Sequence, residues 1–225
     1  KASLLGGGMY PKPGEITLSH AGVLFMDEIT EFRKDVIEVL RQPMEEKKIV
    51  INRNHGRYIF PAEFILVAAC NPCPCGEYPD MNKCNCTHNE IRKYMGRLSS
   101  PFLDRIDLCI EISKIPYEDL NKSGKEETSD IIRKRVEKVR EIQALRYKGN
   151  DSGLNAQMTI KQLNEFCKLD KEGEKIMQLA YNKMGLTARS YHKILKVART
   201  IADMECNENI SSMHLKEAIG YRIVK

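Results

Sequence analysis

Two unbroken apolar runs stand out in the first half of the chain. Gly22 opens a run that continues through Val23–Met26 into Asp27-Glu28, and Phe64–Cys70 ends at Asn71. Apolar runs without alternation are typical of strands that are buried on both faces of a parallel sheet. We therefore expect two neighbouring strands of such a sheet, with polar side chains where each strand ends.

The segments around the first run have weaker patterns. Residues 1–21 are rich in Gly and Pro and then partly apolar, and they are expected to form a loop or an insertion that leads into the first strand. After Glu28, apolar residues at helical spacing predict a helix that ends near Pro43–Glu46. Lys48–Asn52 and Arg57–Phe60 are β-rich runs on either side of a turn that contains Gly, and they predict a β-hairpin.

Cap and strand signals follow the second apolar run. Thr87–Glu90 has the sequence of a capping box, which predicts the start of a short helix. Ser100 followed by Pro101 predicts an N-cap with proline at the first helical position. Leu108–Ile112 has the pattern of a third short strand.

No strand pattern occurs in the second half of the chain. Residues 113–128 are polar and contain Pro116 and Gly124, which predicts a linker. The sequence therefore predicts an α/β part over 1–112, a linker over 113–128 and an all-helical part over 129–225. Helical spacing places the helices near residues 129–147, 159–168, 171–184, 187–206 and 212–222.

Composition is that of an ordinary globular protein, with 42% hydrophobic and 30% charged residues. No apolar run reaches the roughly 18 residues of a transmembrane helix, so we expect no membrane partner. The chain opens at Lys1 without a Met or an apolar leader. We expect a piece of a longer protein in a reducing, cytoplasmic compartment.

Net charge is positive only in the second half. Residues 1–112 hold 14 Lys and Arg against 15 Asp and Glu, and residues 113–225 hold 22 against 16. The expected hairpin nevertheless carries Lys47, Lys48, Arg53 and Arg57. These cations suit a nucleic-acid backbone, and they equally suit an ordinary solvated hairpin.

Four of the eight cysteines form the pattern Cys-x-Cys-x8-Cys-x-Cys, namely Cys73, Cys75, Cys84 and Cys86. Four thiolates suit tetrahedral Zn²⁺, which would cross-link a Pro-rich loop that has few apolar residues to bury. The single-residue gaps are shorter than usual zinc spacing, and His88 is a substitute ligand. Free thiols in a structured loop are the alternative.

The polar residues at the strand ends suggest phosphoryl chemistry. A carboxylate at Asp27 suits Mg²⁺ held through its water shell, and Glu28 suits polarisation of an attacking water. Asn71 suits orientation of that water or contact with a γ-phosphate. The plainer alternatives are solvated acids after a buried strand, and an Asn that caps the following turn.

Two arginines are candidate cations for the same chemistry. Arg105 follows an apolar turn, and Arg189 falls in the first turn of a predicted helix. Each can neutralise charge that develops on phosphate. A local ion pair of Arg105 with Asp104 or Asp107, and a solvated helix face around Arg189, remain open alternatives.

Taken in order, these motifs resemble the AAA+ ATPases of the magnesium-chelatase-like group, ComM/YifB type. The resemblance covers nearly the whole chain, and the Cys-Pro-Cys-Gly loop favours the ComM/YifB type over true chelatase subunits. The segments that carry it are Pro13–Ile16, Leu18–His20, Gly22–Glu28, Phe60–Ala62, Asn71–Gly76, Gly96–Ser99, Leu103–Leu108, Ala188–His192 and Ala198–Asp203.

The resemblance implies a partial AAA+ P-loop-type parallel sheet followed by an all-α lid domain, with ATP and Mg²⁺ as cofactors. Asp27 and Glu28 would form Walker B, with Glu28 the catalytic base. Asn71 would be sensor 1. Arg105 would be the arginine finger that acts on the neighbouring subunit's nucleotide, and Arg189 the sensor 2 arginine.

The resemblance also implies a ring oligomer, expected to be a hexamer, with residues 48–60 as a pre-sensor hairpin at its pore. It implies DNA remodelling or branch migration. A chelatase-like subunit that acts on a protein or metal-insertion partner is the alternative. One departure matters: no G-x-x-x-x-G-K-[ST] phosphate loop is present. We therefore expect this chain alone to be inactive as an ATPase.

Overall fold

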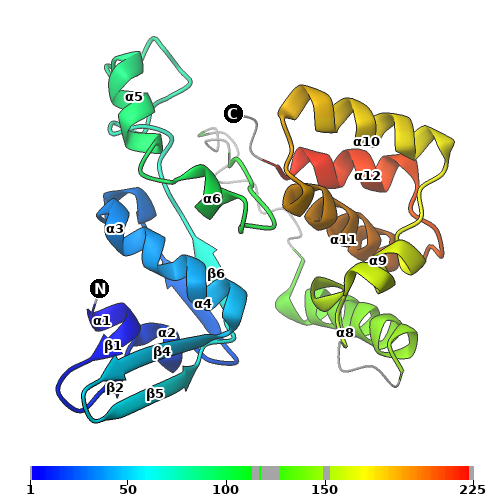
Figure 1. Cartoon of the computed structure of the whole chain (residues 1–225). Helices are drawn as coiled ribbons and strands as arrows, with labels where there is room; N and C mark the ends of the chain where they lie inside the picture. Colours follow the sequence, from blue (N-terminus) through cyan, green and yellow to red (C-terminus); the bar gives the residue numbers. More distant parts are fainter. Residues whose placement is uncertain (1, 113–116, 118–126, 149–152, 223–225) are drawn as a thin grey trace. The chain divides into compact units, whose positions relative to one another are not determined.

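The computed structural model describes residues 2–112, 117, 127–148 and 153–222 (Figure 1). Within these ranges the chain forms two compact units, divided between Arg105 and Ile106. Each unit is described by itself. Of the expected linker over 113–128, only Tyr117, Glu127 and Thr128 fall among the described residues.

The first unit contains the expected parallel strand pair. β3 (Val23–Met26) pairs with β6 (Ile65–Ala68), in the register Val23↔Ile65 to Met26↔Ala68. The two apolar runs of the sequence are therefore adjacent strands that point in the same direction. This confirms the parallel sheet, and it places the residues after both strands at one edge.

The expectation that these strands are buried on both faces is wrong. Leu24 and Met26 are buried, but Phe25 is 62% exposed and Ile65 is 64% exposed. Successive side chains of a strand point to opposite faces. Among the described residues only one face of the pair is packed, so alternate apolar side chains remain open to solvent.

The segment after β3 is helical and ends at Glu46, as predicted, but it is broken into short turns. They are η1 (Ile29–Glu31), α3 (Lys34–Ile37), η2 (Glu38–Leu40) and α4 (Arg41–Glu46). Ile29, Ile37 and Leu40 are buried and form the core of this unit with residues of the strands. Lys47, in the left-handed conformation, ends α4.

The predicted hairpin is confirmed. β4 (Lys48–Arg53) pairs antiparallel with β5 (Gly56–Pro61), with Lys48 opposite Pro61 and Arg53 opposite Gly56. Asn54 and His55 form the two-residue turn. Ile49 and Ile51 are buried and anchor β4 to the core.

The loop or insertion expected over residues 1–21 is a small folded element that leads into β3. It consists of α1 (Ala2–Leu5), β1 (Gly6–Gly7), β2 (Lys12–Pro13) and α2 (Glu15–Leu18), with β1 antiparallel to β2. Gly6 permits this pairing, because a Cβ atom at Gly6 would lie 2.1 Å from the Lys12 carbonyl oxygen. The Gly and Pro residues thus form a tight hairpin rather than an open loop.

Of the two helix starts predicted later in the chain, one agrees with expectation and one is shifted. α5 (His88–Met95) begins with the predicted capping box of Thr87 and Glu90, but the N-cap of α6 (Ser100–Leu103) is Ser99. The Ser99 hydroxyl accepts a hydrogen bond from the Phe102 N–H, so the cap lies one residue before the predicted Ser100.

The third strand over Leu108–Ile112 is absent among the described residues. No ladder forms there, and the Cys109 N–H donates to the Tyr221 carbonyl at 2.8 Å.

The second unit is helical, and its five predicted helices are confirmed. They are α8 (Ser129–Arg146), α9 (Ile160–Phe166), α10 (Lys171–Met184), α11 (Ala188–Met204) and α12 (Ser212–Gly220), with the short η3 (Asn155–Gln157) before α9. Ile194, Leu195 and Ala198 of α11 pack with Leu215 and Ala218 of α12 in the core. None of the helices in the described ranges is both long and apolar enough to cross a membrane.

A buried polar cluster ties α11 to α8 and η3. The carboxylate of Asp203 is fully buried and accepts hydrogen bonds from Arg146, Arg199 and Asn155. The Asn155 Oδ1 atom accepts in turn from Arg146 and from the Tyr147 hydroxyl. This cluster joins α11 to two segments that lie far from it in sequence, and it fixes the position of α11.

Candidate functional site

The candidate catalytic edge lies where β3 and β6 end. Beyond the last ladder pair, the Ala69 N–H donates to the Met26 carbonyl and the Ile29 N–H donates to the Ala69 carbonyl, each at 2.9 Å. These two bonds hold the segment after β3 against the segment after β6. Asp27 and Glu28 therefore lie on one side of the edge and Asn71 follows on the other, which is the arrangement predicted from the two apolar runs.

The backbone at this edge is strained at Glu28. Its φ of 47° and ψ of 45° are left-handed, which costs an L-residue about 1–2 kcal/mol. The Glu28 N–H donates to the Asp27 Oδ1 atom at 2.9 Å. Both side chains are exposed. The two carboxylates are thus presented to solvent by a turn that the neighbouring strand holds in place, and such strain is common at functional sites.

The cysteine loop folds back onto the same edge. Gly76 has a φ of +79°, and a Cβ atom there would lie 3.9 Å from the Asn71 side-chain Cγ and Oδ1 atoms. Asn71 is exposed. The loop that begins directly after Asn71 therefore returns close to the Asn71 side chain.

All four clustered cysteines come together in this loop. The Sγ atoms of Cys73, Cys75, Cys84 and Cys86 lie within 4.8 Å of one another. Cys73 is 3.3 Å from Cys75 and 3.8 Å from Cys84, and Cys75 is 3.6 Å from Cys84. A tetrahedral zinc ion with Zn–S bonds of about 2.3 Å needs sulfurs about 3.8 Å apart. The donor set and its spacing fit zinc.

Other features of the loop agree with a thiolate centre. Cys73 and Cys84 are buried, and the Tyr78 N–H donates to the Cys73 sulfur. A hydrogen bond from the Glu77 backbone lowers the pKa of Cys75 to about 6. Cys86 differs, since burial raises the pKa of its thiol to about 12, which favours the neutral form in the absence of a metal ion. His88, the substitute ligand considered from sequence, is exposed on the first turn of α5 and lies outside the four-sulfur group.

Arg105 is held within the first unit. Its guanidinium forms an ion pair with Glu45 of α4 at 2.8 Å and donates to the Pro101 carbonyl. The Arg105 side chain is only 10% exposed. Sequence reasoning missed Glu45, because sixty positions separate the two residues and no local pattern connects them.

Arg189 lies exposed on the first turn of α11, in the second unit, where the sequence predicted it. Its neighbours on that helix are not simply solvated, as Lys193 forms an ion pair with Asp107 at 2.8 Å. Burial lowers the pKa of both Lys193 and Lys196. Asp27 and Arg189 belong to different units, so their joint action on one nucleotide stays a prediction.

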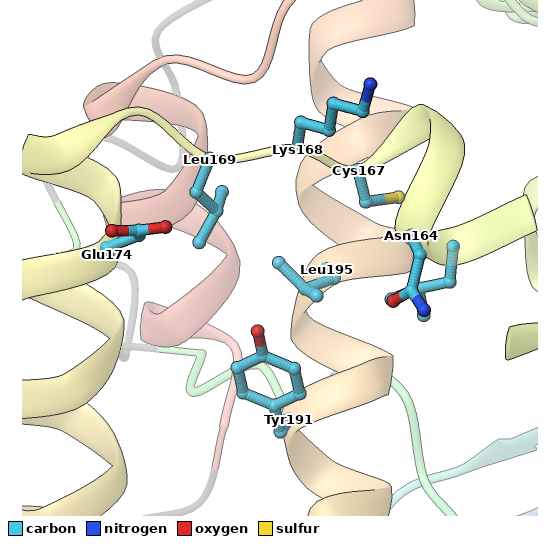
Figure 2. Close-up of a pocket in the computed structure, with 8 residues that line it drawn as sticks. Asn164, Cys167, Lys168, Leu169, Glu174, Tyr191 and Leu195 are labelled. Carbon is cyan, nitrogen blue, oxygen red and sulfur yellow. The ribbon is translucent and has the colours of Figure 1, made fainter. Parts of the chain in front are cut away.

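The second unit also has a small pocket between α9, α10 and α11 (Figure 2). Cys167, Lys168, Tyr191 and Leu195 are among its lining residues. Burial raises the pKa of the Cys167 thiol to about 11, so this thiol is protonated near neutral pH and is a poor nucleophile. The raised pKa therefore gives no support for a nucleophilic role of Cys167 in this pocket.

The fold and the edge together define a class: a partial AAA+ α/β unit with a parallel sheet, followed by an all-α lid domain. Comparison with known families agrees. The family described as magnesium chelatase, subunit ChlI, matches residues 1–120, and its C-terminal family matches residues 126–222. The chain therefore belongs to the magnesium chelatase subunit ChlI family.

Individual relatives are similar over nearly the whole chain. Competence protein ComM of Haemophilus influenzae is 46% identical over 98% of this chain and 42% of its own length. The uncharacterized protein YifB of Escherichia coli is 40% identical over 99% of this chain and 43% of its own length. An uncharacterized MCM-type protein of Methanocaldococcus jannaschii is 26% identical over 93% and 31%. The chain thus spans less than half the length of these relatives.

Proposed function

We propose that this chain supplies the catalytic carboxylates of an ATP-hydrolysing ring subunit that remodels DNA. One observation carries the proposal: β3 and β6 are parallel neighbours, and Asp27, Glu28 and Asn71 follow them at the same edge. Parallel α/β sheets bind their ligands beyond the carboxyl ends of the strands. Hard carboxylate oxygens exposed there suit the magnesium ion that accompanies ATP.

The proposed reaction is transfer of the γ-phosphoryl group of ATP to water. Magnesium, when bound, would neutralise charge on the phosphates, and Asp27 would hold it. Glu28 would accept the proton of the attacking water as its oxygen bonds to the γ-phosphorus and the bond to ADP breaks. The Asn71 amide would orient that water. The turn at Glu28 supports this role, because a hydrogen bond and a neighbouring strand fix it before the nucleotide arrives.

Arg105 fits the proposal under one condition. An arginine finger must reach the nucleotide of a neighbouring subunit, whereas the guanidinium of Arg105 pairs with Glu45. We therefore propose that ring assembly, expected to be hexameric, releases this pair. Arg189 on the lid would contact the nucleotide held by its own subunit.

DNA as the substrate is supported by the basic hairpin and by the name of one relative. Arg53 and Arg57 are exposed on β4 and β5, and one relative is named a competence protein. The alternative, a chelatase-like subunit that acts on a protein or metal-insertion partner, is favoured by the name of the matched family. Salt-sensitive binding of the full-length protein to branched DNA would favour the first. Nucleotide-dependent capture of a protein partner without such binding would favour the second.

We also propose that Cys73, Cys75, Cys84 and Cys86 hold one structural zinc ion, on the sulfur distances given above. Metal analysis of protein purified without chelator should give about one zinc per chain. Cys75→Ser should reduce this strongly. Cys206→Ser, at an exposed cysteine outside the cluster, should not. Less than about half an equivalent in the unmodified protein would favour free thiols.

The ATPase proposal is tested with Glu28→Gln in the full-length protein. This change keeps the shape of the side chain but removes the base, and we expect phosphate release to fall by about 100-fold or more. Glu46→Gln is the matched control: Glu46 is exposed on α4, where its carboxylate accepts a hydrogen bond from the Gln42 side chain at 3.0 Å. The control should retain the full rate. Equal rates in Glu28→Gln and the control would refute the proposal.

A further inference from the structure

Arg222, a buried arginine of the second unit, bridges two segments that each follow a candidate phosphate-binding arginine. It lies just after the end of α12 and is 9% exposed. Its Nη1 atom donates to the Ile106 carbonyl at 2.6 Å, and its Nη2 atom donates to the Ser190 hydroxyl at 3.1 Å. Ile106 directly follows Arg105 in the chain, and Ser190 directly follows Arg189. A single guanidinium therefore holds the next residue after each arginine.

Residues 106–109 are held to the helical unit at two further points. The Asp107 carboxylate forms an ion pair with Lys193 of α11 at 2.8 Å. The Cys109 N–H donates to the Tyr221 carbonyl, at the end of α12, at 2.8 Å. Together with the bond described above, these contacts fasten residues 106–109 to α11 and to the end of α12. A shift of α11 is therefore transmitted to the segment that begins directly after the first unit.

The ion pair of this segment lies in a cluster of cations. The Lys193 side chain is only 17% exposed, and burial lowers the pKa of its ammonium group. Asp107 opposes this shift, whereas the positive charges of Arg222 and Arg189 add to it. The Lys193 ammonium thus responds to charge at Arg189. A phosphate bound there brings negative charge to the cluster and competes with Asp107 for Lys193.

We propose that Arg222 is a positioning residue that couples Arg189 to Arg105. Nucleotide contact at Arg189 changes the hold on residues 106–109, and thereby the position of the finger that acts on the neighbouring subunit's nucleotide. The inference rests on the proposed function, ATP hydrolysis in a ring, and deepens it by naming the device that makes adjacent sites interdependent. Sites coupled in this way hydrolyse ATP cooperatively.

The test measures the rate of phosphate release by the full-length protein as a function of ATP concentration. The unmodified protein should show a Hill coefficient of about 1.5 or more. In Arg222→Lys, the single terminal nitrogen cannot donate to both partners, so the Hill coefficient should fall to about 1. The rate at saturating ATP should fall by about 10-fold, a part of what an arginine finger supplies.

Arg135→Lys is the matched control. Arg135 of α8 also donates through both terminal nitrogens, in this case to the Glu127 carboxylate. This variant makes the same exchange in the same unit but outside residues 106–109 and their partners. It should keep both the Hill coefficient and the rate of the unmodified protein.

A second pair of variants tests the ion pair at a more exposed position. The Asp107 side chain is 67% exposed, so Asp107→Asn should leave the fold intact while it removes the charge that holds Lys193. Its Hill coefficient should also fall to about 1, and Asp107→Glu, which keeps a carboxylate, should restore it. Partial unfolding would lower the rate but leave the Hill coefficient of the remaining rings unchanged.

The proposal is overturned if the unmodified protein hydrolyses ATP without cooperativity, or if either Arg222→Lys or Asp107→Asn keeps its Hill coefficient. It is also overturned if Asp107→Glu loses as much as Asp107→Asn, or if Arg135→Lys loses as much as Arg222→Lys. These outcomes leave the proposed function standing, because ATP is still hydrolysed. No phosphate release from the unmodified protein would instead refute the proposed function, and this inference with it.

Discussion

Replacing Asp203 with Asn removes the negative charge at the centre of the helical unit. The Asp203 side chain is fully buried, and the Arg199 side chain beside it is only 2% exposed. Arg146, which is 14% exposed, donates to the same carboxylate through both terminal nitrogens. The amide of Asn accepts through one oxygen only and places an N–H₂ group against a guanidinium. Two largely buried cations thus lose their compensating charge.

The expected cost follows from this geometry. Removing one partner of a buried ion pair costs about 3–5 kcal/mol, chiefly because the other charge stays buried and unpaired. The cluster links α11 to α8 and η3, so the substitution lowers the free energy that is needed to open the whole helical unit. A loss of 3–5 kcal/mol corresponds to an increase in the open population of about 100- to several-thousand-fold.

Hydrogen–deuterium exchange of the full-length protein measures this opening locally. Slowly exchanging amides of α11 should lose about 100-fold or more of their protection in Asp203→Asn, while amides of β4 and β5 should be unchanged. Asp130→Asn is the matched control, since Asp130 pairs with Arg133 at the surface, with side chains 79% and 67% exposed. Such a pair is worth about 0–1 kcal/mol. Protection of α11 within about threefold of the unmodified protein would show that the buried charges are compensated in some other way.

Three further predictions concern the first unit and the isolated chain. Residues 1–225 alone should release no phosphate from ATP at concentrations where the full-length protein is active, because no phosphate loop is present; a comparable rate would contradict this. A hydrogen bond from Ser99, with a smaller contribution from Arg41, lowers the pKa of the Glu38 carboxyl below its ordinary value of 4.5. The ionised carboxylate therefore stabilises the fold at neutral pH, and this stabilisation is lost as the pH falls through the folded pKa. Glu38→Gln should therefore cost about 0.5–1.5 kcal/mol at pH 7 and progressively less as the pH falls through the folded pKa of Glu38, and a pH-independent difference in urea denaturation would refute the assignment. Zinc chelation should open residues 72–87 to proteolysis and leave α8–α12 intact; an unchanged digestion pattern would count against a metal-stapled loop.

Sequence patterns predicted correctly those elements whose formation depends on residues only a few positions apart. The capping box at Thr87 and the five C-terminal helices agree with the sequence, because caps and helical spacing act within a few residues. The N-cap of α6 moved by one position to Ser99, since Ser99 and Ser100 offer the same hydroxyl and the sequence does not distinguish them. The two apolar runs predicted a parallel pair, but burial on both faces depends on what else covers the sheet.

Contacts between distant segments could not be predicted in the same way. Arg199 and Asp203 look like an ordinary surface pair four residues apart on a helix, yet Arg146 and Asn155 from other elements make them a buried cluster. The cysteine spacing left zinc and free thiols open, and only the folded loop shows that all four sulfurs converge. The pairing of Arg105 with Glu45 likewise depends on the packing of α4. In each case the tertiary packing of distant segments decides which side chains interact.

The central claim is that Asp27, Glu28 and Asn71 form one hydrolytic site at the edge of β3 and β6. The most direct measurement is the single-turnover rate of ATP hydrolysis by the full-length protein with Glu28→Gln, Asn71→Ala and both changes together. Residues that act as one unit are strongly non-additive. We predict that each single change lowers the rate by at least about 100-fold and that the double variant is scarcely slower than Glu28→Gln alone. Losses that multiply in the double variant, or an unchanged rate in either single variant, would contradict the account.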